Sequence, residues 1–313
     1  MRAVKVRNGR IDVVDVSPHD GPGVRIHVRS AGICGSDLHL IDAPDVVPDG
    51  TTLGHEIAGI TDDGTPVAIE PLAPCGQCEP CRSGEYNLCL DSSSMIYGIG
   101  RDGGMADLMW VEERCLTPLP AGLDPRDASL VEPMAVLVHS FRRARAHPDM
   151  RVAVIGGGTI GLCAVAVARS LGCEVALSAR HDSQRSAGER LGAAEITGQY
   201  DLVIEAAGTE SALHEAVELA KPSAEVAIPG IYWGPIDLPG LAMCFKQVNL
   251  CPTTLYARSG AGRDIDHAAA LLATNPDVAD TLITHRFPLD AAVDAFATAA
   301  ERSSGAIKVV LEP

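Results

Sequence analysis

The sequence predicts an α/β fold in two domains, the first rich in strands and the second built on a parallel sheet. The length of 313 residues favours two cores over one. Near the N-terminus, apolar and polar residues alternate as in half-buried strands, at residues 4–7, 11–13 and 24–28. In the second half, continuous apolar runs suit buried parallel strands, at residues 152–155, 175–178, 202–204 and 226–228.

Helical segments separate the later strands, which is the pattern that predicts a parallel sheet. An earlier segment, residues 128–145, has apolar residues at helical spacing. The other predicted helices are residues 162–171, 183–191, 211–219, 268–272 and 291–299. A final strand is expected at residues 307–311.

Composition excludes several classes of function. The formal charge of −16 argues against nucleic acid and acidic membranes as partners, because both need basic patches. No apolar run reaches the ~18 residues of a membrane span, and residues 1–9 contain no apolar segment like that of a signal peptide. We therefore expect a cytoplasmic protein, whose ten cysteines are thiols and metal ligands rather than disulfides.

The strongest local signal is the segment PCGQCEPCRSGEYNLC at residues 74–89. Its four cysteines could enclose one tetrahedral zinc with no open position, as in a structural site. Four unrelated loop thiols are the simpler alternative, and an iron–sulfur cluster is a weaker one because its cysteines are usually spaced differently. The proposed structural zinc ligands are Cys75, Cys78, Cys81 and Cys89.

A second candidate metal site combines a thiolate, an imidazole and a carboxylate. Cys34, His55 and Glu56 are ligand types that zinc accepts. Ser36 and His39 lie between them in sequence and could pass a proton outward. A single cysteine is more often a small buried hydrophobe, so this stretch alone is a weak signal. We expect these groups in loops between strands.

Glu132 is an acidic residue on an otherwise apolar predicted helix. A buried carboxylate needs a partner. Either Glu132 is exposed or paired with an arginine such as Arg142, or it is a fourth group at the metal.

A glycine pattern follows the apolar run at residues 152–155. Gly156, Gly158 and Gly161 form G-x-G-x-x-G between a predicted strand and a predicted helix. The glycines permit a tight turn, close approach of a pyrophosphate and close packing of helix on strand. Thr159 and Ile160 would open the helix, whose N-terminus faces the phosphates.

Together these motifs resemble the zinc-dependent medium-chain dehydrogenases, in particular the sorbitol (polyol) and threonine dehydrogenase branch. The resemblance covers nearly the whole chain. It rests on AGICGSDLH, LGHE, the four-cysteine segment ending GEYNLC, VEPMAVLVHS, IGGGTIG, ITHRFPLDAAVDAF and GAIKVVLEP. It implies a GroES-like catalytic domain, residues 1–131 and 285–313, and a Rossmann cofactor domain, residues 132–284.

The resemblance also implies roles for individual residues. Cys34, His55 and Glu56 match the catalytic zinc cluster, with Glu132 as a further acidic ligand. Ser36 and His39 match a proton relay, and the four-cysteine set matches the structural zinc. Val136 matches a position near the nicotinamide, and Lys308 one that approaches the cofactor phosphates.

The implied activity is hydride transfer between a secondary alcohol, such as a polyol or sugar derivative, and a nicotinamide cofactor, with two zinc ions per chain. Two alternatives remain: a non-catalytic nucleotide-binding regulatory protein of the same fold, and a zinc-free quinone reductase. The set of candidate zinc and relay residues disfavours both. Residues that could line a substrate pocket, by position only, are Leu72, Tyr97, Trp110 and Ile231.

Cofactor preference can be predicted from the end of the second strand. An NAD site usually has an acid there to bind the ribose 2′-hydroxyl, whereas this sequence has Ala179. Ser178, Arg180 and Arg185 could bind a 2′-phosphate instead, although both arginines could be ordinary surface charges. Asp182, the nearest acid, is expected to cap the next helix. We therefore expect NADP(H) over NAD(H).

The apolar run at residues 248–256 could be an edge strand that pairs subunits, as the resemblance implies, or an internal strand. The first reading predicts a homodimer or homotetramer.

Overall fold

A computed structural model of the chain describes residues 1–17, 21–91, 96–260 and 262–313. It divides into two compact units, Met1–Glu132 with Ala257–Pro313, and Pro133–Tyr256. In this division the chain rejoins the first unit at Ala257, earlier than the expected residue 285. The reason is that α8 (Asp264–Thr274) packs on β7 (Leu116–Pro118), and α9 (Pro276–Leu282) on β15 (Ile283–Pro288), within the first unit.

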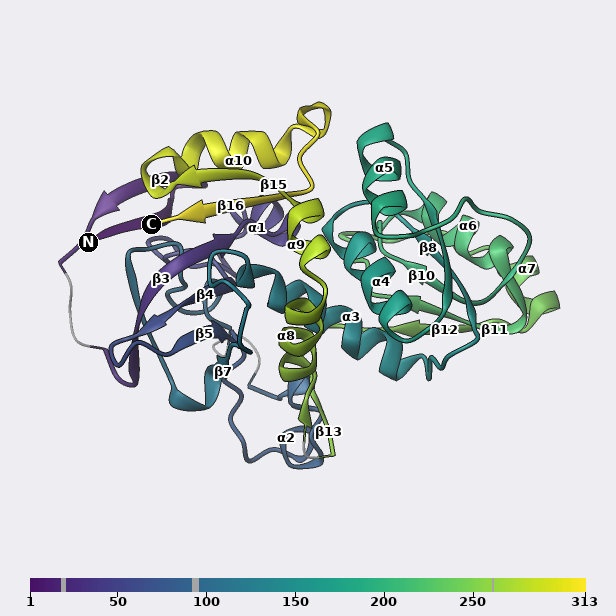
Figure 1. The fold of residues 1–313 in the computed structure, drawn as a ribbon, viewed down its shortest axis with the longest axis horizontal. Helices are drawn as coiled ribbons and strands as arrows, with labels where there is room; N and C mark the ends of the chain where they lie inside the picture. Colours follow the sequence, from purple (N-terminus) through teal and green to yellow (C-terminus); the bar gives the residue numbers. More distant parts are fainter. Residues whose placement is uncertain (18–20, 92–95, 261) are drawn as a thin grey trace. The chain divides into compact units, whose positions relative to one another are not determined.

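The first unit is built on a seven-stranded mixed sheet (Figure 1). Its order is β15-β16-β3-β4-β5-β7, with β6 paired to β3. The remaining bounds are β3 Val24–Gly32, β4 Glu56–Thr61, β5 Pro66–Ile69, β6 Leu108–Val111 and β16 Lys308–Glu312. The last strand, β16, therefore pairs with β3 near the start of the chain, antiparallel through Gly32 and Ala31.

A two-stranded ladder of β1 (Arg2–Arg7) and β2 (Arg10–Asp15) accompanies this sheet, and α10 (Ala292–Ala300) packs on β2 and β16. Their alternating apolar side chains fill one core, which includes Val4, Ile26, Ile57, Leu289 and Phe296. The strands expected near the N-terminus are thus present.

The second unit has a five-stranded, all-parallel sheet in the order β12-β11-β10-β8-β9 (Figure 1). Its strands are β8 Arg151–Ile155, β9 Glu174–Ser178, β10 Tyr200–Glu205, β11 Ala220–Ile228 and β12 Asn249–Pro252. Beyond β9, the described part of the chain has only an isolated parallel bridge, from Ala176 to Ala194, where another strand could pair. The sheet thus has β12 at one edge.

The helices of the second unit are α3 (Val131–Arg143), α4 (Thr159–Ser170), α5 (Asp182–Arg190), α6 (Glu210–Leu219) and α7 (Gly240–Lys246). α4 contacts α5, and α6 contacts α7. β9 lies on one side of β8, and β10, β11 and β12 lie on the other. Crossovers of the usual right-handed kind then put the two helix pairs on opposite faces of the sheet, as in the predicted doubly wound fold.

Three local predictions need correction. Residues 35–40 form a short helix, α1 (Gly35–Leu40), rather than a loop, and residue 56 begins β4. The segment from residue 128 starts with a 3-10 turn, Ala128–Leu130, before α3. α7 and α9 were not anticipated, because each is only seven residues long. Among the described residues, no helix is long and apolar enough to cross a membrane.

Candidate active site

The four cysteines of residues 75–89 converge in the structure. Cys81 lies in the short helix α2 (Glu79–Ser83), and a 3-10 turn, Tyr86–Leu88, precedes Cys89. Sγ–Sγ distances are 3.9 Å from Cys75 to Cys81, 3.3 Å from Cys78 to Cys81, and 4.0 Å from Cys78 to Cys89. A tetrahedron with zinc–sulfur bonds of about 2.3 Å has edges of about 3.8 Å. The four thiols, none in a disulfide, therefore fit a zinc ion.

Main-chain amides favour the thiolate form in this cluster. The Gln77 and Cys78 amides both donate to Cys75 Sγ at 3.4 Å. These bonds lower the pKa of Cys75 to about 6. Burial raises the pKa of Cys81 to about 12. The main-chain amides therefore do not stabilise the thiolate form of all four cysteines equally. A bound cation would complete the deprotonation.

The second cluster is assembled from two segments of the first unit. Cys34 precedes α1, His55 precedes β4, and Glu56 is the first residue of β4. One ligand atom from each residue lies within 4.8 Å of the other two. His55 and Glu56 are buried and Cys34 is half-buried. Sulfur, nitrogen and oxygen donors at this spacing fit a zinc ion that keeps a position open.

Asp37 holds this cluster in place, and the sequence reasoning missed it. Its carboxylate accepts a hydrogen bond from the Cys34 amide at 2.9 Å. Its other oxygen lies 3.3 Å from His55 Nδ1, a buried nitrogen with no hydrogen-bond partner among the described residues. Burial lowers the pKa of His55, but Asp37 and Cys34 outweigh that effect and raise the pKa well above its ordinary value. The carboxylate three residues after Cys34 was the available signal.

The two relay candidates lie on α1. Ser36 Oγ is half-buried, 3.4 Å from His55 Nε2. His39 is exposed, near the end of the helix. One hydroxyl is therefore beside the candidate metal ligands, and one imidazole faces solvent.

Glu56 has a buried counter-charge that sequence reasoning assigned elsewhere. Lys308 Nζ, on β16, lies 2.7 and 2.5 Å from the two Glu56 carboxylate oxygens. It also donates to the Ile33 carbonyl at 2.9 Å. Gly32 makes room for this carboxylate, because a Cβ there would come within 2.1 Å of it. The contact of Lys308 with cofactor phosphates stays a prediction.

Glu132 lies in the first turn of α3 and is buried, so the expectation that it is exposed is wrong. It is not among the residues whose ligand atoms lie within 4.8 Å of one another. Its role as a further acidic ligand stays a prediction.

The glycine turn of the second unit has the form the motif predicts. Gly156 has a φ of +107°, which favours glycine. A Cβ on Gly161 would come within 1.7 Å of the Gly156 carbonyl oxygen, so glycine permits the close packing of α4. A Cβ on Gly158 would meet no atom, which leaves open space before Thr159 and Ile160 at the start of α4. The turn therefore fits a pyrophosphate at the helix N-terminus.

The residues at the end of β9 differ in how free their side chains are to bind a cofactor phosphate. Arg180 is exposed, and its guanidinium has no partner among the described residues. Arg185 instead donates to the carbonyls of Ala179 and Arg180, at 2.7 and 3.0 Å, and pairs with Asp182. Asp182 is the first residue of α5 rather than its cap, which is His181. Ser178, half-buried at the strand end, accepts the Gly156 amide through its carbonyl at 2.9 Å.

Glu205, at the end of β10, is a further residue that sequence reasoning missed. It is fully buried and accepts the amides of Ala207 and Gly208 at 2.8 and 2.9 Å. Tyr232 donates its hydroxyl to the same carboxylate at 2.7 Å. Burial raises the pKa of Glu205 above its ordinary value. It fixes two loops at the carboxyl edge of the sheet, where such folds bind nucleotides.

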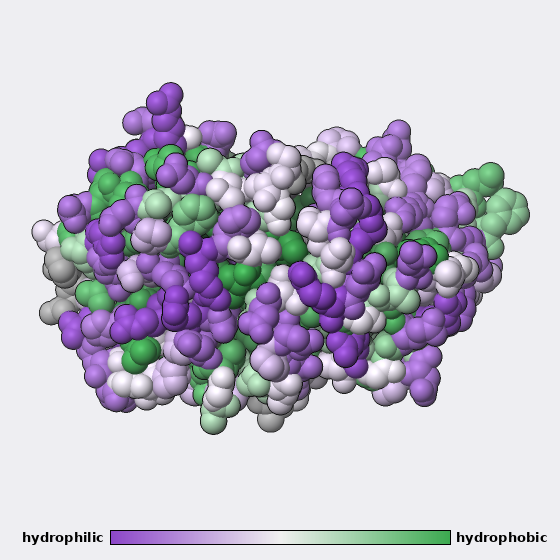
Figure 2. Space-filling view, turned by 45° about the horizontal axis from the view of Figure 1, so that its top comes forward, coloured by the Kyte–Doolittle hydropathy of each residue, from purple (hydrophilic) through white to green (hydrophobic). Residues whose placement is uncertain are grey.

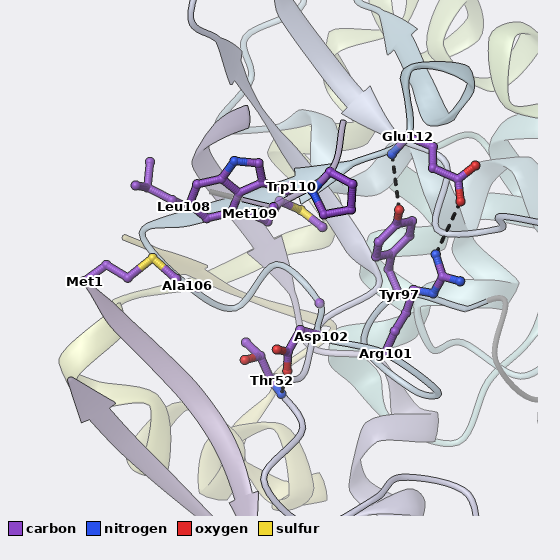
Figure 3. Close-up of a pocket in the computed structure, with 13 residues that line it drawn as sticks. Met1, Thr52, Tyr97, Arg101, Asp102, Ala106, Leu108, Met109, Trp110 and Glu112 are labelled. Atoms are coloured by element: carbon purple, nitrogen blue, oxygen red, sulfur yellow. Dashed lines mark hydrogen bonds and ion pairs between the residues drawn. The ribbon is translucent and has the colours of Figure 1, made fainter. Parts of the chain in front are cut away.

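The residues proposed to line a substrate pocket do not gather at one place. Tyr97 and Trp110 line a cavity of about 270 Å³ in the first unit, shown in Figure 3. There the Tyr97 hydroxyl accepts the Glu112 amide, and none of the candidate zinc ligands lines the cavity. Leu72 is buried, and Ile231 is exposed in the second unit, where Val136 is half-buried on α3.

Two family models match the chain. The alcohol dehydrogenase GroES-like domain matches residues 20–121, and the zinc-binding dehydrogenase model matches residues 159–274. The first covers the four-cysteine segment and the mixed cluster. The second covers α4 and most of the parallel sheet.

Individual relatives agree over most of the chain. A probable D-xylulose reductase A from Arthroderma otae is 32% identical over 74% of this chain and 75% of its own length. The 2-dehydro-3-deoxy-L-galactonate 5-dehydrogenase of Pseudoalteromonas atlantica is 30% identical over 93% of both. A zinc-binding dehydrogenase from Sinorhizobium meliloti 1021, crystallised with NADP, superposes with a TM-score of 0.89. That structure is 29% identical and covers 100% of this chain and 99% of its own.

Proposed function

Because this chain belongs to the zinc-dependent medium-chain dehydrogenases and is an oxidoreductase, we propose that it transfers a hydride between a secondary alcohol and a nicotinamide cofactor. The observation that carries this proposal is the open cluster of Cys34, His55 and Glu56, with Ser36 beside it. A regulatory protein without catalysis needs no hydroxyl beside a metal site.

The proposed role of each side chain in the reaction follows from its position in the structure. When bound, zinc supplies a Lewis acid and the nicotinamide carries the hydride. Cys34, His55 and Glu56 would hold the metal, and Asp37 orients the first two of them. Ser36 would accept the proton of the substrate hydroxyl as it gives up its own, and exposed His39 would release a proton to solvent. Lys308 balances the charge of Glu56.

The second zinc is proposed to be structural. Four thiolates leave no coordination position for a substrate. Its ligands, Cys75, Cys78, Cys81 and Cys89, would order a segment that has few apolar side chains to bury.

The proposed substrates are polyols, sugar derivatives or related hydroxy compounds. The names of the relatives support this class, since they describe a probable D-xylulose reductase and a 2-dehydro-3-deoxy-L-galactonate 5-dehydrogenase. A panel of polyols, sugar acids, simple secondary alcohols and ketones, followed at 340 nm with and without a chelator, tests the proposal. Turnover that a chelator abolishes and zinc restores is expected. No turnover on any member would favour the non-catalytic alternative, and chelator-resistant reduction of quinones would favour the zinc-free one.

We propose NADP(H) as the preferred cofactor. Arg180 supports this, since its exposed guanidinium can bind a 2′-phosphate, and no acid occupies position 179. Arg185 contributes less, because backbone carbonyls and Asp182 already occupy it. Arg180→Ala should raise the KM for NADP⁺ about tenfold and leave that for NAD⁺ unchanged. Equal or better wild-type efficiency with NAD⁺ would contradict this preference.

We also propose a cytoplasmic homodimer or homotetramer joined through the second unit. β12 is an edge strand that pairs only with β11 among the described residues, so the internal-strand reading is wrong. The neighbouring α7 exposes Leu241 and Phe245, at 76% and 81%. Figure 2 shows this hydrophobic surface at the right of the view. Light scattering at micromolar concentration should give a multiple of the chain mass, which Phe245→Glu should reduce; a wild-type monomer would contradict the proposal.

A further inference from the structure

A cavity of about 460 Å³ lies within the first unit, beside the four-cysteine segment. Four arginines line it, together with one acidic residue, Glu70. The arginines are Arg82, Arg114, Arg258 and Arg263. The whole chain has the opposite balance, with 41 acidic and 25 basic residues. The cavity is therefore a local concentration of positive charge in an acidic protein.

The one acidic residue does not neutralise the four arginines. Glu70 is buried, and Arg263 pairs with it at 2.9 Å. Its other oxygen accepts the Tyr86 hydroxyl at 2.5 Å. Arg263 also pairs with Asp266 at 2.6 Å and donates to the carbonyl of Leu116 at 2.9 Å. Glu70 and Arg263 thus form an internally satisfied wall of the cavity.

The other three arginines have weaker ion pairs or none among the described residues. Arg114, which is exposed, pairs with half-buried Glu112 at 2.8 Å, a contact that solvent weakens. Arg82 and Arg258 are both exposed, and neither guanidinium has a partner among the residues that the structure describes. Two exposed guanidinium groups that line the cavity therefore remain available to bind an anion.

The backbone brings these two arginines together. Arg258 lies on β13 (Arg258–Ser259), which pairs with β14 (Gly262–Arg263). The Arg258 amide donates to the Gly84 carbonyl at 3.0 Å, just after α2, the helix that carries Arg82. Figure 1 shows β13 beside α2. A main-chain hydrogen bond thus holds the two segments at one edge of the cavity.

The register of the β13–β14 hairpin also favours a bound anion beside Arg258. Arg258 is directly opposite Arg263 in the antiparallel pair. Like charges at opposite positions destabilise a hairpin unless an anion lies between or beside them. Arg263 is stabilised by Glu70 and Asp266, whereas Arg258 has no such counter-charge among the described residues.

From this arrangement we infer that the cavity is a binding site for a small phosphate-bearing anion, held by Arg82 and Arg258 with Arg114 at its side. Planar guanidinium groups bind phosphate oxygens through paired hydrogen bonds. The volume exceeds that of free phosphate, so the site accommodates an organic phosphate as well as the inorganic ion. The cavity contains none of the residues proposed to bind the catalytic metal or to move the proton, although Leu72, a substrate-pocket candidate by position only, also lines it.

The test compares two double variants of the zinc-loaded full chain. Arg82→Gln with Arg258→Gln removes the two available guanidiniums. Arg10→Gln with Arg190→Gln is the matched control, because both residues are exposed and lie outside the cavity. Calorimetry and thermal unfolding are measured with inorganic phosphate, glycerol 3-phosphate and succinate, at constant ionic strength set with chloride. Any phosphate bound at the glycine turn is common to both variants.

Phosphate or glycerol 3-phosphate should bind the control and wild type alike and bind the Arg82/Arg258 variant at least about tenfold more weakly. Tighter binding of glycerol 3-phosphate than of inorganic phosphate would identify an organic phosphate as the natural source, and the reverse order would identify the free ion. Equal phosphate affinity in the two double variants would overturn the inference. So would tighter binding of succinate than of either phosphate.

Zinc content provides an independent readout. The same arginines could instead offset the negative charge of four thiolates around zinc, since Cys81 also lines the cavity. In that case the Arg82/Arg258 variant would lose zinc in chloride alone, and phosphate would stabilise wild type no more than chloride does. That result would overturn the phosphate site.

Discussion

The two cysteine-bearing clusters of the first unit differ in how the chain builds them. The four-thiol cluster takes all its ligands from residues 75–89, ordered around the short helix α2. The mixed cluster takes Cys34 from the start of α1 and His55 and Glu56 from the start of β4. One needs only local folding, whereas the other needs two segments and a counter-charge from β16.

This difference suits the closed cluster to stabilising its segment and the open cluster to binding a substrate. A closed local set of thiolates can order its own segment but has no position for a substrate. An open set of three ligands, held by neighbouring secondary structure, leaves a position free and keeps its geometry when that position is exchanged. Substitutions in the two clusters should therefore differ in their effect on the turnover of folded enzyme.

Cys34→Ala should have the largest effect. It removes a ligand of the open cluster, so turnover should fall about 10³-fold or more. The melting temperature should change little, because Cys34 is only half-buried. Steady-state rates and thermal unfolding measure the two effects, with Cys244→Ala, an exposed thiol outside both clusters, as the control. Retained turnover would mean that the open cluster is not the reaction centre.

Ser36→Ala should lower turnover about 10²-fold, as removal of a positioned proton-transfer group does. Cofactor affinity should not change, because the hydroxyl lies by His55 rather than at the glycine turn. His39→Asn should have a smaller effect that buffer partly rescues, since water can replace an outer relay group. Ser83→Ala is the matched control. Near-normal turnover of Ser36→Ala at neutral pH would rule out the relay.

Asp37→Asn should lower turnover and open-site zinc affinity about tenfold, as loss of a group that orients metal ligands does. The amide can still accept the Cys34 amide proton but removes the charge beside His55. Elemental analysis after dialysis, with Asp45→Asn as the exposed control, should show loss from one site only. Loss of both metals together would contradict independent clusters.

Cys81→Ala should have the smallest effect on turnover, within about threefold for molecules that remain folded and keep the open site loaded. Its effect on stability should be the largest of the four, with a fall in melting temperature of about 5 °C or more. Cys115→Ala, a nearby buried thiol outside the cluster, controls for packing loss. Unchanged stability together with lost turnover would reverse the roles of the two clusters.

The four-thiol cluster was predictable because its information is local. Spacing alone brings Cys75, Cys78 and Cys81 to one point, whatever the rest of the chain does. The parallel sheet was predictable for a similar reason, since each strand and helix carries its own hydrophobic period. The fold class and family predicted from these patterns are confirmed.

Partners that meet through tertiary structure could not be predicted from the sequence. Nothing near Glu56 in sequence indicates that Lys308 will lie beside it, because the contact depends on β16 pairing with β3. In the sequence, Glu205 is only a polar residue at the end of a buried strand. Its role in holding two loops is visible only from the Ala207 amide and the Tyr232 hydroxyl that donate to its carboxylate. The sequence suggested that Arg185 is free to bind a phosphate. In the structure, its guanidinium donates hydrogen bonds to two backbone carbonyls of the turn before α5.

The contact between Glu56 and Lys308 also sets an order of events during synthesis. The two residues are 252 positions apart, and chains emerge from the ribosome N-terminus first. If the four-thiol segment binds zinc as proposed, it can do so while translation continues, because all its ligands lie within residues 75–89. The ligands of the open cluster are also made early, but the carboxylate of Glu56 has no counter-charge from Lys308 until β16 is synthesised. On the proposed function, an unfinished chain would therefore hold an open cluster whose buried carboxylate is not yet balanced.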